Sequence, residues 1–293
     1  MPLPDWVKQP QTDWVALHQI KAGLRRYRLH TVCESARCPN IHQCFGRGSA
    51  TFMILGGTCT RSCGFCAVPR GRPEALDPEE PENVARMAAE MRLRHVVITS
   101  VNRDELPDGG AAHWAATVTA VRGHLPRAKI EVLTPDFCGH WEALATVLRA
   151  APDVYNHNLE TVPRLYQRVR PQARYRQSLE VLATARRLAA SPAMLTKSGL
   201  MLGLGETRAE VEQLLRDLRE ADCDIVTIGQ YLQPTRRSLP VTEYLPPETF
   251  DDYRGYGLGL GFRAVFSGPL VRSSYMADKV FDLSSADFAD SSG

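Results

Sequence analysis

An alternation of apolar strand candidates with amphipathic helix candidates runs through residues 51–258 and constrains the fold more than any other feature of this sequence. Strands that alternate with helices favour a parallel sheet with helical crossovers. Six such units fit, fewer than the eight of a closed barrel. The sequence therefore predicts an α/β fold. A partial (β/α)6 barrel of the TIM type fills residues 51–268, with extensions at residues 1–50 and 269–293, the second ending in a disordered tail.

Hydrophobic periodicity and proline or glycine breaks set the expected elements. Apolar runs predict strands at 51–55, 95–99, 129–133, 154–156, 195–201, 225–228 and 262–266. Amphipathic windows predict helices at 12–26, 82–92, 111–122, 140–149, 162–169, 178–189, 208–220 and 247–258. Polar clusters follow several of the strands, at 100–105, 134–136, 156–161, 203–206 and 230–235. Because barrels of this kind carry their sites at the carboxyl ends of the strands, we expect the site there.

Three cysteines directly after the first expected strand, Cys59, Cys63 and Cys66, have the spacing C-x3-C-x2-C. Iron–sulfur clusters are held by thiolates at short fixed spacings, and four protein ligands close a four-iron cube. Three thiolates leave one iron open to a small molecule. The spacing therefore predicts a reactive [4Fe–4S] cluster and is typical of radical S-adenosylmethionine (SAM) enzymes.

A second triplet, Cys33, Cys38 and Cys44, has the spacing C-x4-C-x5-C. Two tight triplets in a chain without a secretion signal indicate metal binding and not a disulfide framework. Zinc is the alternative, completed by His30 or His42, although zinc sites usually come as C-x2-C pairs. The two remaining cysteines, Cys138 and Cys223, stand alone and are expected to be inert.

Composition narrows the class of protein. The net charge is +2, and 44 % of the residues are hydrophobic, which is ordinary for a globular chain. No long basic run indicates nucleic acid binding, and no apolar stretch is long enough to span a membrane. The basic side chains are mostly arginine, which fits surface ion pairs or a modest patch for an acidic partner. We expect a cytoplasmic location, because the first residues lack a targeting pattern.

Several motifs together resemble the lipoyl synthase family over residues 14–277. They are CESARCPN at 33–40, GTCTRSCGFC at 57–66, TSVNRDEL at 99–106, NHNLET at 156–161, KSGLMLGLGE at 197–206 and RSSY at 272–275. The first cysteine spacing alone would indicate only the radical SAM superfamily. The second triplet together with RSSY is specific to lipoyl synthases.

This resemblance implies two [4Fe–4S] clusters and SAM as cofactors. The Cys59/Cys63/Cys66 cluster would cleave SAM to a 5′-deoxyadenosyl radical, which removes hydrogen from C6 and C8 of a protein-bound octanoyl-lysine. The auxiliary cluster on Cys33, Cys38 and Cys44 would be consumed as the sulfur source. The expected partners are octanoylated lipoyl-carrier domains, an electron donor such as ferredoxin or flavodoxin, and proteins that rebuild the spent cluster.

The resemblance also assigns Ser274, in RSSY, as the fourth ligand of the auxiliary cluster. An oxygen ligand is harder than a thiolate, so we infer that it leaves more readily as the cluster is dismantled. A helix cap by this serine is the structural alternative. Phe65 is expected near the adenine of SAM, or simply packed against the cluster.

Further contacts with SAM or substrate are expected from Asn156, Asn158, Glu160 and Lys197, although the first three could instead cap the following helix. His157 is the histidine most suggestive of a role. Two other functions remain open from the residues alone: another radical SAM sulfur-inserting enzyme similar to biotin synthase, and a non-catalytic two-cluster electron carrier.

Overall fold

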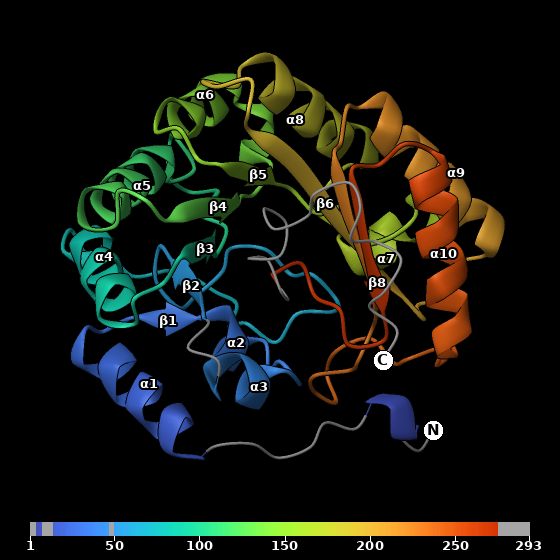
Figure 1. Cartoon of the computed structure of the whole chain (residues 1–293), viewed down its shortest axis with the longest axis horizontal. Coiled ribbons are helices and arrows are strands. Elements are labelled where there is room, and N and C mark those ends of the chain that lie inside the picture. The colour runs from blue at the N-terminus through green and yellow to red at the C-terminus, as the bar shows by residue number, and fades with distance from the viewer. Residues whose placement is uncertain (1–3, 8–13, 47–49, 275–293) are drawn as a thin grey trace.

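The computed structural model describes residues 4–7, 14–46 and 50–274, and its main feature is a curved sheet with helices along its outer face (Figure 1). The predicted domain boundaries near residues 50 and 268 stay predictions. Of the expected C-terminal extension and its tail, residues 275–293 lie outside the described residues.

The sheet of the described residues has its strands in chain order. The first pair is antiparallel, and every later pair is parallel. The strands are β1 His30–Thr31, β2 Thr51–Ile54, β3 His95–Ser100, β4 Lys129–Leu133, β5 Val154–Asn156, β6 Leu195–Leu202, β7 Ile225–Gln230 and β8 Ala264–Gly268. Six strand–helix units, followed by a last parallel strand, confirm the predicted partial barrel.

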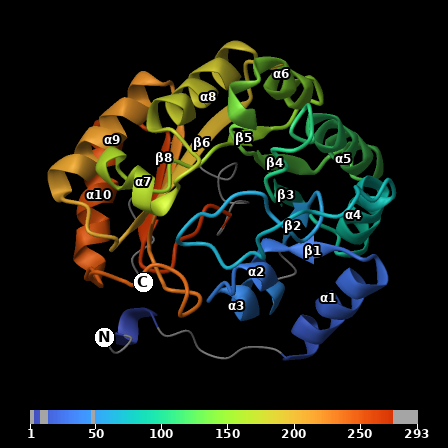
Figure 2. The same cartoon turned by 180° about the vertical axis from the view of Figure 1, so that it is seen from behind.

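The crossover helices cover the convex face of this sheet, and both views show the same arc (Figures 1 and 2). They are α4 Glu80–Glu90, α5 Ala111–His124, α6 Trp141–Arg149, α8 Tyr175–Arg187, α9 Arg208–Glu220 and α10 Pro247–Gly259. The other helical segments are shorter or precede the barrel: α1 Trp14–Arg26, α2 Val32–Ser35, α3 Ile41–Gly46, α7 Tyr166–Val169, and 3-10 turns at Asp5–Val7, Phe137–Gly139 and Pro163–Leu165. In the described part of the chain, no helix combines the length and apolarity needed to cross a membrane.

All seven predicted strands occur, with shifts of one or two residues at their ends. The predicted helix at 162–169 is divided into the turn Pro163–Leu165 and α7. The prediction lacked β1, α2 and α3, which together surround the second cysteine triplet. These elements have two to six residues, too few to show a hydrophobic period.

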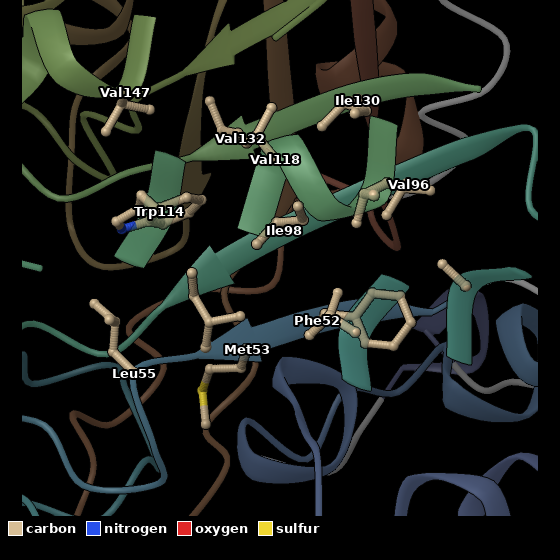
Figure 3. Close-up of a cluster of buried hydrophobic side chains, with 14 of the residues drawn as sticks. Phe52, Met53, Leu55, Val96, Ile98, Trp114, Val118, Ile130, Val132 and Val147 are labelled. Carbon is tan, nitrogen blue, oxygen red and sulfur yellow. The ribbon is translucent and has the colours of Figure 1, made fainter. Parts of the chain in front are cut away.

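The two faces of each barrel strand have different environments, because successive side chains point to opposite sides. Outward-facing Ile98 and Val132 pack with Trp114 of α5 in the main core, where all three are fully buried (Figure 3). Burying such a side chain contributes about 1.5–3 kcal/mol. The inward-facing residues Thr99 and Leu133 instead line a cavity inside the barrel. Strand alternation therefore divides structural from site-facing residues.

Candidate active site

A cavity of about 190 Å³ opens where β2 to β5 end, as predicted for a barrel site. Its wall combines the cysteine loop, defined as residues 57–71, with the segments that follow β3, β4 and β5. Six predicted site residues line it: Cys59, Cys63, Phe65, Cys66, Asn158 and Glu160. His157 also reaches the wall. The structure therefore brings the first triplet together with two of the predicted polar contacts.

The cysteine loop is held by backbone contacts on both sides. The Cys59 N–H donates to Pro69 O at 2.8 Å, and the Gly71 N–H donates to Cys59 O at 3.1 Å, which closes the loop on itself. The Gly64 N–H donates to Val169 O, and the Gly64 carbonyl accepts from the Leu239 N–H. A Cβ on Gly64 would lie 2.8 Å from the Leu239 side chain. These contacts therefore fix the conformation of the loop.

Backbone N–H groups point at two of the loop sulfurs. Cys59 Sγ accepts from the N–H of Arg61 at 3.4 Å and from that of Asn102 at 3.3 Å. Cys66 Sγ accepts from the Val68 N–H at 3.4 Å. Burial raises the pKa of the Cys66 thiol to about 11, so only a bound cation would hold it as thiolate at neutral pH. Clustered thiols with N–H donors suit iron–sulfur ligation.

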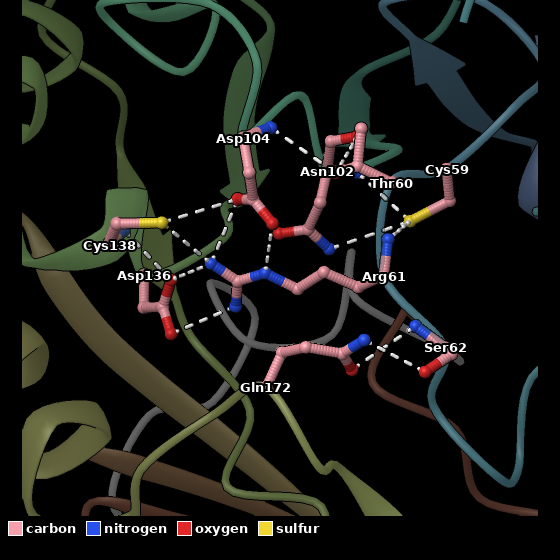
Figure 4. Close-up of polar contacts among 9 residues, drawn as sticks. All are labelled: Cys59, Thr60, Arg61, Ser62, Asn102, Asp104, Asp136, Cys138 and Gln172. Atoms are coloured by element: carbon pink, nitrogen blue, oxygen red, sulfur yellow. Dashed lines mark hydrogen bonds and ion pairs between the residues drawn. The ribbon is translucent and has the colours of Figure 1, made fainter. Parts of the chain in front are cut away.

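Arg61, between the first two cysteines of the loop, is clamped by two carboxylates (Figure 4). Its guanidinium donates to Asp104 at 2.7 and 3.0 Å and to Asp136 at 2.6 and 3.0 Å. Burial would raise the pKa of Asp136, but hydrogen bonds and charge from Arg61 outweigh it and lower that pKa. Cys138 Sγ lies 3.2 Å from Arg61 Nη2. Arg61 therefore ties the loop to the segments after β3 and β4.

Several buried polar atoms of the cavity wall have no partner among the described residues. They are Ser100 Oγ, Asn102 Oδ1, Asn158 Oδ1 and Arg170 Nε. Buried polar groups are normally hydrogen-bonded, so a cluster of unpaired ones indicates that a polar ligand completes the site. This donor and acceptor set, beside three thiols, fits a cofactor with amino, carboxylate and hydroxyl groups such as SAM.

Glu160 and Asn158 form the acidic side of the wall. Asn158 Nδ2 donates to Glu160 Oε1 at 3.0 Å, and Arg170 Nη1 donates to the Asn158 carbonyl at 2.7 Å. Burial raises the pKa of Glu160, although the nearby Arg170 charge opposes it. Glu160 also has a left-handed backbone, with φ at 67°. A carboxylate held in this way could accept hydrogen bonds from an ammonium group.

Asn156 and Lys197 lie in a buried network and not in the cavity wall. Lys197 Nζ donates to Glu131 at 2.9 and 3.1 Å, and Asn156 Nδ2 donates to Glu131 Oε1 at 3.0 Å. The side chains of Lys197 and Glu131 are 1 % and 0 % exposed. His95 Nε2 is 3.4 Å from the same carboxylate. Burial would raise the pKa of Glu131, but Lys197 and His95 lower it to about 2.

The second triplet gathers next to the sheet edge. Cys33 lies in α2, Cys44 in α3, and Cys38 in the turn between them, where its N–H donates to Cys33 O at 3.0 Å. Burial raises the pKa of Cys33 to about 12, and the charges of Cys38 and Cys44 add to the rise. Burial also raises the pKa of Cys38, while the charge of Arg272 opposes it.

Arg272 belongs to the segment that carries Ser274. Asn40 Nδ2, from the second triplet's turn, donates to Leu270 O at 2.7 Å, so this segment meets the triplet. Ser274 is partly buried, and its role as a cluster ligand stays a prediction. Among the described residues, no group of three His, Cys, Asp or Glu side chains could hold one metal ion.

Sequence reasoning missed Arg61, Asn102, Asp136 and Arg170 as individual site residues. Asn102 and Asp136 fall within the polar clusters predicted after strands, which was the available signal. Arg61 gave no signal of its ion pairs, because Asp104 and Asp136 are distant in the chain. Arg170 lies outside the polar clusters, and no pattern links it to Asn158, whose carbonyl it contacts. Cys223 is fully buried, as expected for an inert thiol, whereas Cys138 is exposed and contacts the Arg61 clamp.

Comparison with known proteins places this geometry in a family. The radical SAM superfamily profile matches residues 53–218. The lipoyl synthase of Rubrobacter xylanophilus is 57 % identical, over 94 % of this chain and 85 % of that protein. The lipoyl synthase of Methylococcus capsulatus is 56 % identical, over 94 % and 85 %. The crystal structure of methylornithine synthase shares the fold at 13 % identity, with a TM-score of 0.56 over 89 % of this chain and 80 % of that one. With such similarity along nearly its whole length, and with the first cysteine triplet in the wall of the barrel cavity, the chain belongs to the lipoyl synthase family of radical SAM enzymes.

Proposed function

We propose that this chain converts the octanoyl-lysine of a carrier protein into lipoyl-lysine by inserting sulfur at C6 and C8. The single observation that carries this proposal is the cavity shared by three loop thiols and unpaired polar atoms, in a member of the lipoyl synthase family. The family uses SAM and two [4Fe–4S] clusters. Family membership also decides against a biotin synthase-like enzyme and against a non-catalytic electron carrier.

In this proposal Cys59, Cys63 and Cys66 hold the first cluster and leave one iron for SAM. When bound, the clusters and SAM supply the hydrogen abstraction and the sulfur; the protein supplies binding, orientation and exclusion of water. The N–H bonds to Cys59 and Cys66 stabilise negative charge on the sulfurs. Arg61 keeps these N–H groups and thiols in one loop conformation.

Glu160 and Asn158 are proposed to bind SAM, with Phe65 against its adenine. The support is their place in the cavity wall and the unpaired Asn158 Oδ1. Asn156 and Lys197 both bond Glu131 in the buried network beneath the cavity. This supports a role in positioning the cavity wall and not direct contact with SAM.

Cys33, Cys38, Cys44 and Ser274 are proposed to hold the sacrificial cluster. The approach of Arg272 to Cys38, and of Leu270 to the same turn, supports this assignment. Ser274→Cys should keep the cluster and slow sulfur insertion; lipoyl formation at the parent rate would contradict the idea that the oxygen ligand eases iron release.

The carrier-domain substrate follows from the family. A ferredoxin or flavodoxin as electron donor, a cluster-rebuilding partner and the cytoplasmic location stay predictions from the sequence.

The test is anaerobic reconstitution with iron and sulfide, followed by SAM, dithionite and an octanoyl-lysine peptide. Mass spectrometry should show lipoyl-lysine and 5′-deoxyadenosine. Cys59→Ala should abolish both products, whereas Cys223→Ala, at a buried thiol outside the cavity, should retain them. Intact SAM in the wild-type reaction would refute the proposed function.

A further inference from the structure

The end of the described chain, residues 269–274, leaves β8 and turns into the barrel, toward the cysteine loop (Figures 1 and 2). We call these residues the C-terminal segment. Three hydrogen bonds fix it to three different parts of the protein: the Gln230 N–H to Pro269 O at 3.2 Å, Asn40 Nδ2 to Leu270 O at 2.7 Å, and Asn158 Nδ2 to Ser273 Oγ at 2.6 Å. The segment therefore connects β7, the second triplet's turn and the cavity wall.

Gly229, inside β7, leaves the space that the backbone of this segment occupies. A Cβ at this position would lie 2.1 Å from Val271 O, 3.1 Å from Val271 C and 3.2 Å from Arg272 Nη1. All three of these nearest atoms belong to the C-terminal segment, and two are backbone atoms that no rotamer change can move. Moving Val271 O from 2.1 Å to an ordinary contact of 3.4 Å would displace the segment by more than 1 Å.

A glycine inside a strand weakens the strand and commonly marks a close backbone approach. Here the approach is to a segment that ends at Ser274 and not to another strand. Gly199 of β6 adds a second point of contact, because a Cβ there would lie 3.1 Å from Ser273 Oγ. That Cβ would also meet Thr227 Oγ1 at 2.5 Å, so a substitution at Gly199 would disturb the barrel itself. Gly229 is the cleaner probe of the segment.

Ser273 is the last anchor before Ser274. Its hydroxyl accepts from the same Asn158 amide that donates to Glu160, so the segment is bonded directly to the wall of the cavity. An anchor one residue from Ser274 restricts where the Ser274 oxygen can lie. The two serines of the motif can therefore have separate tasks.

We propose that Gly229 and Ser273 are positioning residues for the auxiliary cluster: Gly229 admits the segment, Ser273 fixes its end, and together they place Ser274 on the fourth iron. This inference rests on the proposed function, in which Ser274 is that ligand. It assigns to a strand glycine and to the first serine of the motif a task in cluster completion.

The experiment uses the full chain with Cys59, Cys63 and Cys66 all changed to Ala, so that only the auxiliary cluster can form. Gly229→Ala, Ser273→Ala and Ser274→Ala are each added, and Gly259→Ala is the matched control, because a Cβ there meets no atom within 4 Å. After anaerobic reconstitution with ⁵⁷Fe, Mössbauer spectra report the oxygen-bound iron, and a chelator reports the rate of iron loss.

Gly259→Ala should match its parent. Gly229→Ala should lose the spectrum of the oxygen-bound iron, as Ser274→Ala does, and should release iron at least fivefold faster. Ser273→Ala should show a mixed spectrum with an intermediate rate. Circular dichroism shows whether Gly229→Ala folds. If it does not, the Ser273→Ala result decides whether the segment positions Ser274, because removing the Ser273 hydroxyl leaves the backbone contacts of Gly229 in place.

Parent-like spectra and rates for Gly229→Ala and Ser273→Ala, beside a changed Ser274→Ala, would overturn the positioning roles while ligation by Ser274 stands. A parent-like Ser274→Ala would instead refute that ligation, and with it this part of the proposed function.

Discussion

The ion pair of Lys197 with Glu131 offers a sharp test of whether a buried polar residue near the site is structural or binds the cofactor. Lys197→Met keeps the length of the side chain and removes its charge. Removing one partner of a buried pair costs about 3–5 kcal/mol, because the other charge is left uncompensated. Glu131 would keep the Asn156 amide at 3.0 Å, so we expect the lower end, about 3 kcal/mol.

The cost should depend on pH. Glu131 has a pKa lowered from 4.5 to about 2, so it stabilises the fold above pH 4.5, and this contribution is lost as the pH falls toward 2. In Lys197→Met, burial is no longer opposed by the lysine charge and the pKa of Glu131 rises. Its ionised form then destabilises the fold, so the gap between wild type and variant should widen from pH 5 to pH 8.

Anaerobic differential scanning calorimetry at one scan rate is the assay. For a chain of this size, a loss of about 3 kcal/mol in the free energy of unfolding lowers the Tm by roughly 5 °C. Lys129→Met is the control, since Lys129 makes a comparable 2.9 Å bond to Asp153 but is 46 % exposed. That surface pair is worth about 0–1 kcal/mol.

The double variant Glu131→Leu/Lys197→Met should recover most of the lost stability, because a buried ion pair can be replaced by apolar side chains at little cost. Binding of SAM to Lys197→Met should change less than threefold. An unchanged Tm together with a tenfold loss of SAM affinity would refute the structural assignment and restore Lys197 as a cofactor contact.

Three further outcomes are expected at the cavity. In Arg61→Lys the lysine cannot span both carboxylates. The substitution should lower the free energy of unfolding by about 2–3 kcal/mol and reduce the iron bound per chain severalfold after reconstitution. Glu160→Gln removes a charged acceptor and should weaken SAM binding about 10- to 100-fold in equilibrium dialysis, with both clusters intact; unchanged affinity would place the amino group elsewhere. Cys138→Ala should retain the parent's iron content, because Arg61 keeps both aspartates; halved iron would show that this thiol supports the loop.

The barrel was predictable because each parallel strand is a short apolar run between turn residues, and seven such runs were recognised. The N-terminal region was not, because β1, α2 and α3 depend on contacts with the sheet and with each other. β1, for example, pairs His30 with Met53 across the first sheet edge. Such short elements are stabilised by tertiary packing, which a local pattern does not contain.

The candidate site divides in a similar way. Cysteine spacing placed the first triplet, and polar residues after strands placed Asn158 and Glu160 at the cavity. The Arg61 clamp joins residues 43 and 75 positions apart, so no window of sequence shows it. Pairings of this kind follow from the order and register of strands, which must be known first.

Asn156 and Lys197 were predicted as cofactor contacts but do not lie in the cavity wall. Their positions along β5 and β6 explain this difference. The inward faces of β5 to β8 begin with a buried apolar layer, formed by Val154, Leu195, Ile225 and Ala264. Lys197 lies two residues beyond Leu195 on the same face, directly above that layer, where its charge has no access to water. It therefore requires a buried carboxylate, which β4 supplies.

Asn158, two residues beyond Asn156, is the first of this series to reach the cavity. Alternation along a barrel strand thus tells whether the side chain of a polar residue points inward. The number of residues between that residue and the apolar layer tells whether it meets a buried counter-charge or a ligand.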